Sequence, residues 1–347
     1  MRDPEKILII RFSSLGDVIL ASPLIRVLRT AYPKAQIDFL VKSEYADVLK
    51  FNHHLSSVIE LKTAEREELG TLKKQLYKTG YDTIIDIHNS LRSRYLRWFS
   101  GAKYTCVINK QAVARFALVK LKWNFYKRVV SVADRYLEAA KMLGIRDDGQ
   151  GLEIFIPSDI QLSVKAILAK YNLERYKTVI GLAPTSKHFT KRWLPERFVA
   201  CGEALAKKHH AKIFIFGDKN DTDYCGDIAQ MINARLGSSG AESFAGKISL
   251  LETAAALDFC TVVVSNDTGV MHLAAARKRK VVALFGSTVR EFGFFPYGTE
   301  SIVVEQKELP CRPCSHIGLD RCPQGHFKCM KDITVEQVVQ ATEKLLE

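Results

Sequence analysis

The chain has 347 residues, of which 47% are hydrophobic and 26% are charged. This composition is that of an ordinary globular protein and excludes a disordered or fibrous chain. At roughly 100 to 200 residues per domain, the length predicts two domains. Lysine and arginine number 51 against 38 acidic residues, a net charge of +13, which favours an anionic partner such as nucleic acid, a membrane surface or a phosphorylated substrate.

The N-terminus and the cysteines are informative about the cellular compartment of the protein. The stretch "MRDPEKILIIRF" is charged and leads directly into a strand, without the apolar region or cleavage site of a signal peptide. No apolar run approaches the roughly 18 residues that cross a bilayer. We therefore expect a cytoplasmic protein, in which the eight cysteines are reduced unless a metal binds them.

Short runs rich in Val and Ile alternate with longer segments of helical period along the whole chain. Because the runs are continuously apolar, they are typical of strands covered on both faces, as in parallel sheets. The predicted strands are 6–12, 36–41, 57–61, 83–87, 105–109 and 152–156 in the first half, and 178–184, 212–217, 261–267, 280–286 and 301–306 in the second. This pattern predicts an α/β protein in which the doubly wound fold occurs twice.

Two helical segments mark the predicted organisation. The polar segment 158–177 separates the two series of strands and is the expected hinge region. The last residues, 334–347, predict a short amphipathic helix in which Thr334 is the N-cap and Gln337 completes a capping box.

The first candidate site residue is Asp17, in "RFSSLGDVILASP" after the first strand. Ligands of open α/β sheets lie beyond the carboxyl ends of the strands, and Ser13, Ser14 and Gly16 form a turn that directs backbone N–H groups there. The alternative is that Asp17 only interacts with the dipole of its own helix. The loop is neither a Walker A sequence nor G-x-G-x-x-G, so neither nucleotide-binding motif is predicted.

A second polar turn, Asn266-Asp267-Thr268-Gly269, separates a strand from a helix rich in small residues. Such a turn directs several N–H groups at one anion. His272 falls on the same side of the first helical turn, where its imidazole could donate to a phosphate or ribose oxygen. The alternative is an ordinary core histidine.

A third element is "GLAPTSKHFTKRWLPERF", which again follows a strand. Its hydroxyls and cations suit a diphosphate, and they are Thr185, Ser186, Lys191 and Arg192. A solvated basic loop is the alternative, but the Trp-Leu-Pro sequence at 193–195 would anchor the loop to the body of the domain.

Basic and aromatic residues are interleaved in 88–104 and 115–128. The basic ones are Arg92, Arg94, Arg97, Arg115, Lys120, Lys122, Lys127 and Arg128. This pattern is typical of a helix or loop on an anionic membrane surface. Stacking of single-stranded nucleic acid and a plain solvated face are the alternatives.

Four cysteines near the C-terminus have the spacing C-x2-C-x7-C-x6-C, and they are Cys311, Cys314, Cys322 and Cys329. Four thiolates could bind Zn or Fe, with His316 and His326 as spare ligands. The spacing is more compact than in zinc ribbons, so reduced thiols in a packed loop are the alternative, and no metal is included in the predicted site.

Taken together, these motifs resemble those of glycosyltransferase family 9, the ADP-heptose:lipopolysaccharide heptosyltransferases. The resemblance covers nearly the whole chain, through "KILIIRFSSLGDVILASPLIRVLR", "IIDIHNSLRSR", "VADRYLEAAKMLGI", "KRWLPERF", "AGKISLLETAAALDFCTVVVSNDTGVMHLAAA" and "VVALFGST". The Cys-rich tail is more similar to that of heptosyltransferase II than to heptosyltransferase I.

The resemblance implies a GT-B fold, in which two Rossmann-like doubly wound parallel-sheet domains face a central cleft. Residues 1–157 would bind the acceptor, 158–333 the ADP-sugar, and the helix 334–347 would pack back towards the first domain. The implied reaction is inverting, metal-independent transfer of L-glycero-D-manno-heptose from ADP-heptose to Kdo or heptose of the lipopolysaccharide inner core. The resemblance further implies a peripheral membrane protein on the cytoplasmic face of the inner membrane that binds no nucleic acid.

The resemblance also implies roles for individual residues. Asp17 would be the general base and Lys191 would contact the diphosphate, while Asp267, Thr268, Gly269 and His272 would line the nucleotide and sugar pocket together with Thr185, Ser186 and Arg192. The predicted acceptor side comprises Ser14, Gly16, Asn89, Arg92, Arg115 and Lys122. Two points depart from the family or stay open: Ser131 replaces a histidine of the His-x-x-Asp-Arg-Tyr pattern, and either Asp218 or Asp221 would contact the donor ribose.

Two other functions are compatible with parts of the sequence. One is a heptosyltransferase of the autotransporter-modifying kind, whose acceptor is a protein and whose relatives hold iron through four cysteines. The other is a non-catalytic nucleic-acid-binding module, suggested by the basic aromatic stretches; it would give no role to Asp17, and the nucleotide-pocket motifs argue against it.

Overall fold

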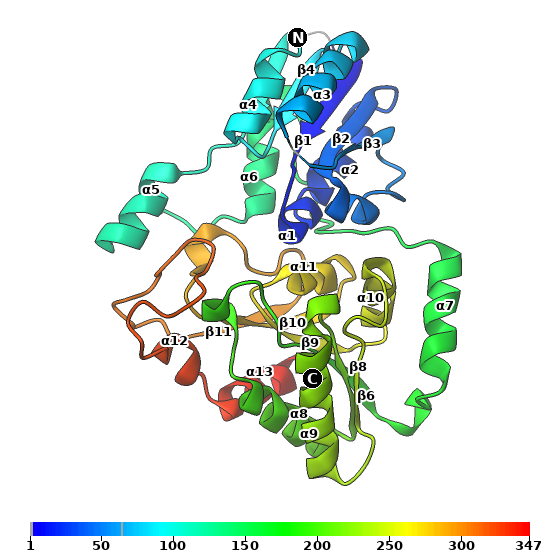
Figure 1. Ribbon diagram of the computed structural model, residues 1–347, viewed down its shortest axis with the longest axis vertical. Helices are drawn as coiled ribbons and strands as arrows, with labels where there is room; N and C mark the ends of the chain where they lie inside the picture. The colour runs from blue at the N-terminus through cyan, green and yellow to red at the C-terminus, as the bar shows by residue number, and fades with distance from the viewer. Residues whose placement is uncertain (1–2, 64) are drawn as a thin grey trace. The chain divides into compact units, whose positions relative to one another are not determined.

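The computed structural model describes residues 3–63 and 65–347, which are drawn in Figure 1. They form two compact units: one comprises Met1–Ala112 and Val130–Phe155, and the other comprises Val113–Val129 and Ile156–Glu347. The main crossover between the units lies between Phe155 and Ile156, and the segment Val113–Val129 clusters with the second unit. Each unit contains its own sheet.

The sheet of the first unit has five parallel strands in the order β3-β2-β1-β4-β5. They are β1 (Lys6–Ile10), β2 (Gln36–Lys42), β3 (Ser57–Leu61), β4 (Thr83–Asp86) and β5 (Tyr104–Val107). On the central strand, Leu8 and Ile10 pack into one cluster while Ile7 and Ile9, on the opposite face, are equally buried. Burial of both faces explains the continuous apolar runs and confirms the prediction.

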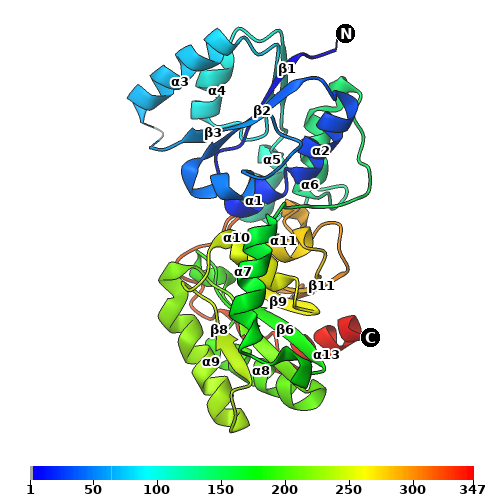
Figure 2. The same ribbon diagram turned by 90° about the vertical axis from the view of Figure 1, so that its right-hand side faces the viewer.

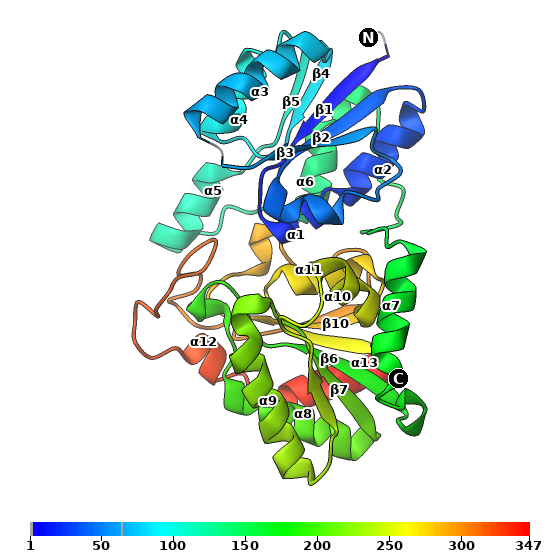
Figure 3. The same ribbon diagram turned by 45° about the vertical axis from the view of Figure 1, so that its right-hand side comes forward.

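Helices cover both faces of this sheet, with α3 and α4 on one side and α2 and α6 on the other (Figure 3). The helices are α1 (Leu15–Ile19), α2 (Ser22–Ala31), α3 (Arg66–Thr79), α4 (Leu91–Trp98) and α6 (Val132–Ala139). In α3, Leu69, Leu72 and Leu76 recur at helical spacing and are buried against the sheet. Gly80 ends that helix in the left-handed conformation, at φ 69°.

The sheet of the second unit has six parallel strands in the order β11-β10-β9-β6-β7-β8. They are β6 (Thr178–Ala183), β7 (Ala211–Ile215), β8 (Ala241–Ser243), β9 (Val262–Asn266), β10 (Lys280–Phe285) and β11 (Ser301–Glu305). All the strands predicted for this half are present, and β8, which has only three residues, was not predicted.

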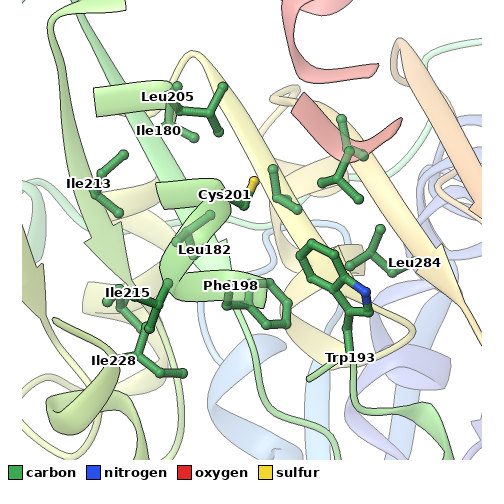
Figure 4. Packing of buried hydrophobic residues seen from close by; sticks show 14 of the residues in the cluster. Ile180, Leu182, Trp193, Phe198, Cys201, Leu205, Ile213, Ile215, Ile228 and Leu284 are labelled. Atoms are coloured by element: carbon green, nitrogen blue, oxygen red, sulfur yellow. The ribbon is translucent and has the colours of Figure 1, made fainter. Parts of the chain in front are cut away.

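Two layers of helices cover this second sheet, with α7, α10 and α11 on one face and α8, α9 and α13 on the other (Figure 2). They are α7 (Ser158–Ala169), α8 (Pro195–His209), α9 (Thr222–Leu236), α10 (Leu250–Leu257), α11 (Gly269–Ala276), α12 (Lys328–Lys331) and α13 (Val335–Leu346). Trp193 and Phe198 meet edge to face in the core between the strands and α8, with ring centroids 5.0 Å apart (Figure 4). Within residues 3–63 and 65–347, none of the helices has the length and apolar character to cross a membrane.

One sequence expectation is wrong. Residues 152–156 are apolar because Leu152 and Ile154 are buried, but they pair with no strand in the described part of the chain. The C-terminal helix α13 begins at the predicted capping box of Thr334 and Gln337. Its apolar residues Val338, Ala341 and Leu345 are buried in the core of the second unit.

Candidate active site

Each sheet has a point where the strand order reverses, and ligands of doubly wound folds bind beyond the strand ends at such a point. In the first unit the reversal lies between β1 and β4, so it is flanked by the loops 11–14 and 87–90. In the second unit it lies between β6 and β9, flanked by the loop 184–194 and the turn at 267–268. The motifs that the sequence singled out occupy all four positions.

Asp17 stands in the first turn of α1, and Ser14 is the N-cap of that helix. The Asp17 Oδ2 accepts hydrogen bonds from the Ser14 backbone N–H at 3.1 Å and from the Ser14 hydroxyl at 2.9 Å. Asp17 therefore completes a capping box with Ser14. This capping does not account for the contacts of the second carboxylate oxygen of Asp17.

That second oxygen, Oδ1, lies 2.6 Å from Nη2 of Arg11 and 3.2 Å from the hydroxyl of Tyr136. Burial alone would raise the pKa of Asp17, but the charge of Arg11 and the hydrogen bonds from Ser14 lower it below its ordinary value. The carboxylate is thus ionised at neutral pH. Tyr136 is buried whereas Ser14 is exposed, so Ser14 is the more accessible of these two donors.

The loop after β4 is built around Asp86, which is fully buried. Its carboxylate accepts from the backbone N–H groups of His88 at 3.0 Å and Asn89 at 2.6 Å, and pairs with Nη1 of Arg97 at 2.9 Å. The Asn89 side chain donates to the carbonyl of Ile108 and thereby shapes the loop. Burial lowers the pKa of His88 to about 3, so its imidazole is neutral.

The predicted acceptor residues separate into two groups. Ser14, Gly16, Asn89 and Arg92 lie on the first unit, and Arg92 is exposed with no ion pair among the described residues. Arg115 and Lys122 belong to the second unit. The ammonium of Lys122 donates to the carbonyls of Cys311 at 3.0 Å and Pro313 at 2.7 Å. Lys122 therefore also supports the Cys-rich loop, a contact that the sequence did not predict.

In the second unit, Asp267 is the centre of the polar cluster and is buried. Its Oδ2 pairs with Nζ of Lys191 at 2.7 Å and accepts from the hydroxyl of Thr288 at 2.8 Å. These three residues follow β9, β6 and β10, which are neighbouring strands. Sequence reasoning brought Lys191 and Asp267 together but missed Thr288, although "VVALFGST" was among the motifs.

The loop that carries Lys191 is held at both ends by Asn266. The Asn266 side chain donates to the carbonyl of Pro184 at 2.8 Å and accepts from the backbone N–H of Trp193 at 3.1 Å. Within the loop, Nε of Arg192 donates to the carbonyl of Ser186 at 2.6 Å. Trp193 is fully buried, which confirms the predicted anchor and excludes a freely solvated loop.

The helix α11 begins after Thr268, whose side chain makes no capping hydrogen bond. The first N–H groups of the helix, from Gly269 onwards, therefore have no side-chain cap and can bind an anion. His272 is buried in the first turn. Together with Lys191, this helix end can stabilise negative charge on a phosphate group.

The Cys-rich segment, residues 311–329, packs against the Lys191 loop. The Thr190 hydroxyl accepts from the backbone N–H of Leu319 at 2.8 Å and from the Ser287 hydroxyl at 2.9 Å. A Cβ added to Gly318, which has φ 106°, would lie 2.6 Å from Cβ of His188 and 3.0 Å from Cδ of Lys191. Only glycine fits here, so the Cys-rich segment helps to position the loop.

The cysteines of this segment are free thiols. Sγ of Cys314 lies 3.3 Å from the carbonyl oxygen of Cys311, and Sγ of Cys311 is 3.9 Å from Nε2 of His326. Burial raises the pKa of Cys329 to about 12. Across the described ranges, no three His, Cys, Asp or Glu side chains gather as metal ligands would.

The two carboxylates considered for the donor ribose lie after β7. Asp218 caps the short helix Lys219–Asp221 by accepting from the Asn220 N–H at 2.6 Å, and Asp221 accepts from the Asp218 N–H at 3.2 Å. Asp218 is the exposed one of the two.

Comparison with known proteins agrees with this arrangement. Residues 69–321 match the family described as glycosyltransferase family 9 (heptosyltransferase). The chain is 26% identical to lipooligosaccharide heptosyltransferase 2 of Campylobacter jejuni over 336 residues, covering 96% of each protein.

Solved structures resemble the fold over the full length. A glycosyltransferase family 9 protein from Veillonella parvula has a TM-score of 0.81 at 24% identity, covering 100% of this chain and 98% of that one. E. coli ADP-heptose LPS heptosyltransferase II has a TM-score of 0.73 at 22% identity, covering 98% of each chain. The predicted fold class, two α/β domains of the GT-B type, is confirmed.

Proposed function

The chain belongs to glycosyltransferase family 9, the heptosyltransferases, and from this premise we propose that it transfers L-glycero-D-manno-heptose from ADP-heptose to the lipopolysaccharide inner core. One observation carries the reaction type: Asp17 is buried, ionised and placed at the strand-order reversal of the first unit. A carboxylate in this state can accept the proton of a sugar hydroxyl.

In the proposed reaction, an acceptor hydroxyl displaces the Ser14 hydroxyl from Asp17 and attacks the anomeric carbon of the donor. The new C–O bond forms on one face while the bond from that carbon to the diphosphate breaks on the other, so configuration inverts. The hydroxyl proton passes to Asp17, and ADP leaves with the bonding electrons. General-base assistance of this kind is typically worth about 10² to 10⁴ in rate.

Departure of ADP requires stabilisation of the charge on its diphosphate. Lys191 and the uncapped N–H groups of α11 at Thr268 and Gly269 are suited to this task. Protein groups therefore supply the positive charge, and we propose that the step uses no metal ion. Asp267 and Thr288 hold the Lys191 ammonium in place, while Thr185, Ser186, Arg192 and His272 complete the donor site.

The acceptor that fits the charge of the protein is Kdo-lipid A or its heptosylated form. Lipid A and Kdo are anionic, and the protein has a net charge of +13. Arg92, exposed beside the loop after β4, is available to an acceptor phosphate or carboxylate. Because this acceptor is a membrane lipid, we propose that the protein acts as a peripheral protein on the cytoplasmic face of the inner membrane.

The proposal is tested by transfer assays with ADP-heptose and purified acceptors. The wild-type protein should glycosylate a Kdo-containing core acceptor, and Asp17→Asn should fold and bind ADP but lose about a hundredfold or more in turnover. Near-normal transfer by Asp17→Asn would refute its role as base. Transfer to a protein acceptor alone would instead favour the autotransporter-modifying activity. Mass analysis of inner-core lipopolysaccharide from a strain lacking the gene would identify the sugar position.

A further inference from the structure

The segment Val113–Val129 leaves the first unit, packs with the second and then returns. It contains α5 (Ala112–Phe116), labelled in Figure 1, followed by a π-helical turn over Ala117–Leu121. The segment has five basic residues and no acidic one. Apart from Arg115 and Lys122, its residues are assigned to neither candidate substrate site.

The segment presents apolar side chains on both sides. Ala117 and Leu118 are buried, as expected for one face of a surface helix. The other side is also apolar, with exposed fractions from 48% for Leu121 to 79% for Val113. The exposed apolar residues are Val113, Phe116, Leu121, Trp123, Phe125 and Val129. Six exposed apolar residues within one stretch of 17 residues suit an interaction surface.

Polar contacts fix the segment to the second unit. Lys122 donates to the carbonyls of Cys311 and Pro313, and the Asn124 side chain donates to Oε1 of Glu291 at 3.2 Å. These contacts hold the residues on either side of Trp123. The rings of Trp123 and Phe125 lie edge to face with centroids 6.3 Å apart. The segment therefore holds its aromatic rings on the outside of the protein.

Three other cations of the segment are also exposed. Lys120, Lys127 and Arg128 are exposed and form no ion pair with any residue that the structure describes. A second copy of the segment would meet them with like charge, which disfavours self-association. Nucleic acid would use the rings but not the aliphatic side chains of Val113 and Leu121. An anionic bilayer uses both, because cations bind its headgroups and aromatic side chains favour its interface.

We infer that Val113–Val129 docks the protein on an anionic phospholipid bilayer, with Phe116, Trp123 and Phe125 inserted at the interface and Lys120, Lys127 and Arg128 at the headgroups. The inference deepens the proposed function, since it rests on an acceptor that is embedded in a membrane. It assigns docking to the unit that holds the donor site. The residues around Asp17 and Arg92 are then free to bind the acceptor sugar.

Binding to vesicles tests the inference directly. The full-length protein should float with vesicles of phosphatidylethanolamine and phosphatidylglycerol, and high salt should weaken the binding without abolishing it, because only the ionic part is screened. The variant Phe116→Ser/Trp123→Ser/Phe125→Ser should lose about a hundredfold or more in partition coefficient. The matched control is Leu162→Ser/Met231→Ser, which alters two exposed apolar residues elsewhere on the second unit and should bind as the wild type does.

Tryptophan fluorescence tests the insertion itself. The chain has three tryptophans, of which Trp193 is fully buried and Trp98 and Trp123 are exposed. In a Trp98→Phe background, the emission of Trp123 should shift to the blue on addition of vesicles and should be quenched by brominated lipid. An unshifted and unquenched spectrum would overturn insertion.

Transfer assays with two acceptors distinguish a failure of this inference from a failure of the proposed function. The triple variant should transfer heptose to a deacylated, water-soluble acceptor at the wild-type rate but lose about tenfold or more with a vesicle-embedded lipid acceptor. If the wild type transfers to neither acceptor, the proposed function fails while vesicle binding still decides the inference. Vesicle binding by the triple variant equal to the wild type would overturn it. The inference would also be overturned if the wild type bound no vesicles but formed a dimer that is lost in the triple variant.

Discussion

The Nη2 atom of Arg11 lies 2.6 Å from Oδ1 of Asp17, and both side chains are almost completely buried. Arg11 precedes the turn of 13–16 and Asp17 follows it, so the ion pair closes this turn at the carboxyl end of β1. The second nitrogen of Arg11, Nη1, donates to the carbonyl of Ile87 at 2.8 Å and links the turn to the loop after β4. The pair thus fixes both the charge and the position of the proposed base.

Removal of Arg11 should shift the pH dependence of transfer. The pKa of Asp17 lies below its ordinary value, and the charge of Arg11 is the largest factor that lowers it against burial. In Arg11→Met the pKa of Asp17 should therefore rise, and the acid limb of kcat/KM should move to higher pH. Arg11→Lys keeps the charge and should shift the limb less. An unchanged acid limb in Arg11→Met would contradict a role for Asp17 as base.

The same pair predicts how stability depends on pH. A carboxylate whose pKa is lowered on folding stabilises the protein above the unfolded pKa of about 3.9, and this contribution is lost as the pH falls through the lowered folded pKa. The free energy of unfolding in urea should therefore be lower for Asp17→Asn than for the wild type at neutral pH. The difference should shrink in acid. A difference that stays constant down to the lowest pH would exclude the lowered pKa.

A double-mutant cycle tests the Lys191–Asp267 pair, whose atoms are 2.7 Å apart. Lys191→Met leaves the buried Asp267 carboxylate unpaired and should reduce the free energy of unfolding by about 3 kcal/mol. Adding Asp267→Asn should recover most of that loss, since the uncompensated charge is gone. ADP affinity, measured by calorimetry, should stay low in the double variant. Recovery of ADP binding in the double variant would exclude Lys191 as the diphosphate contact.

Much of the fold was predictable because the central strands of each sheet are buried on both faces and are therefore continuous apolar runs. The failures have local causes. Strand β8 has only Ala241, Glu242 and Ser243, which is too short to produce a pattern. The run 152–156 is apolar because it is buried, and burial alone does not distinguish an extended segment from a paired strand.

Contacts within the site were predictable where the residues that make them lie close together in one sequence motif. Asp17 with Ser14, and Asp267 with the start of α11, are local in sequence. The contact between Asp17 and Tyr136 joins residues 119 apart, and Lys122 reaches carbonyls 189 and 191 residues away. Contacts over such separations are set by packing, and a single sequence contains no signal for them. For Tyr136 the only indication was its place in the "VADRY" motif.

Thr190 provides a test of the contact between the Cys-rich segment and the donor loop. Thr190→Val keeps the volume but leaves the Leu319 N–H without its acceptor, at a cost of about 1–3 kcal/mol. Because the neighbouring Lys191 loses a fixed support, ADP affinity should fall as well. The control is Thr178→Val, which breaks an exposed hydroxyl pair with Thr261 at 2.7 Å and should change ADP affinity little. Equal ADP affinities in both variants would show that the segment does not position the loop.

Arg92 and Lys122 should respond differently to loss of charge, although the sequence grouped them together. Arg92 is exposed and unpaired within the described part of the chain, so Arg92→Glu should raise the KM for a lipid acceptor while leaving the KM for ADP-heptose nearly unchanged. Lys122 holds the carbonyls of Cys311 and Pro313. Lys122→Met should therefore loosen the Cys-rich segment and speed up alkylation of Cys311 and Cys314.

Lys127→Met is the matched control for Lys122→Met, since Lys127 is exposed on the same segment and makes no such contact among residues 3–63 and 65–347. It should leave the rate of thiol alkylation, followed by mass spectrometry, at the wild-type value. If Lys122→Met raises the KM for the acceptor without faster alkylation, then Lys122 binds substrate as the sequence suggested. Faster alkylation at an unchanged KM for a soluble acceptor identifies Lys122 as a structural residue, because its three N–H donors are then needed by the loop carbonyls.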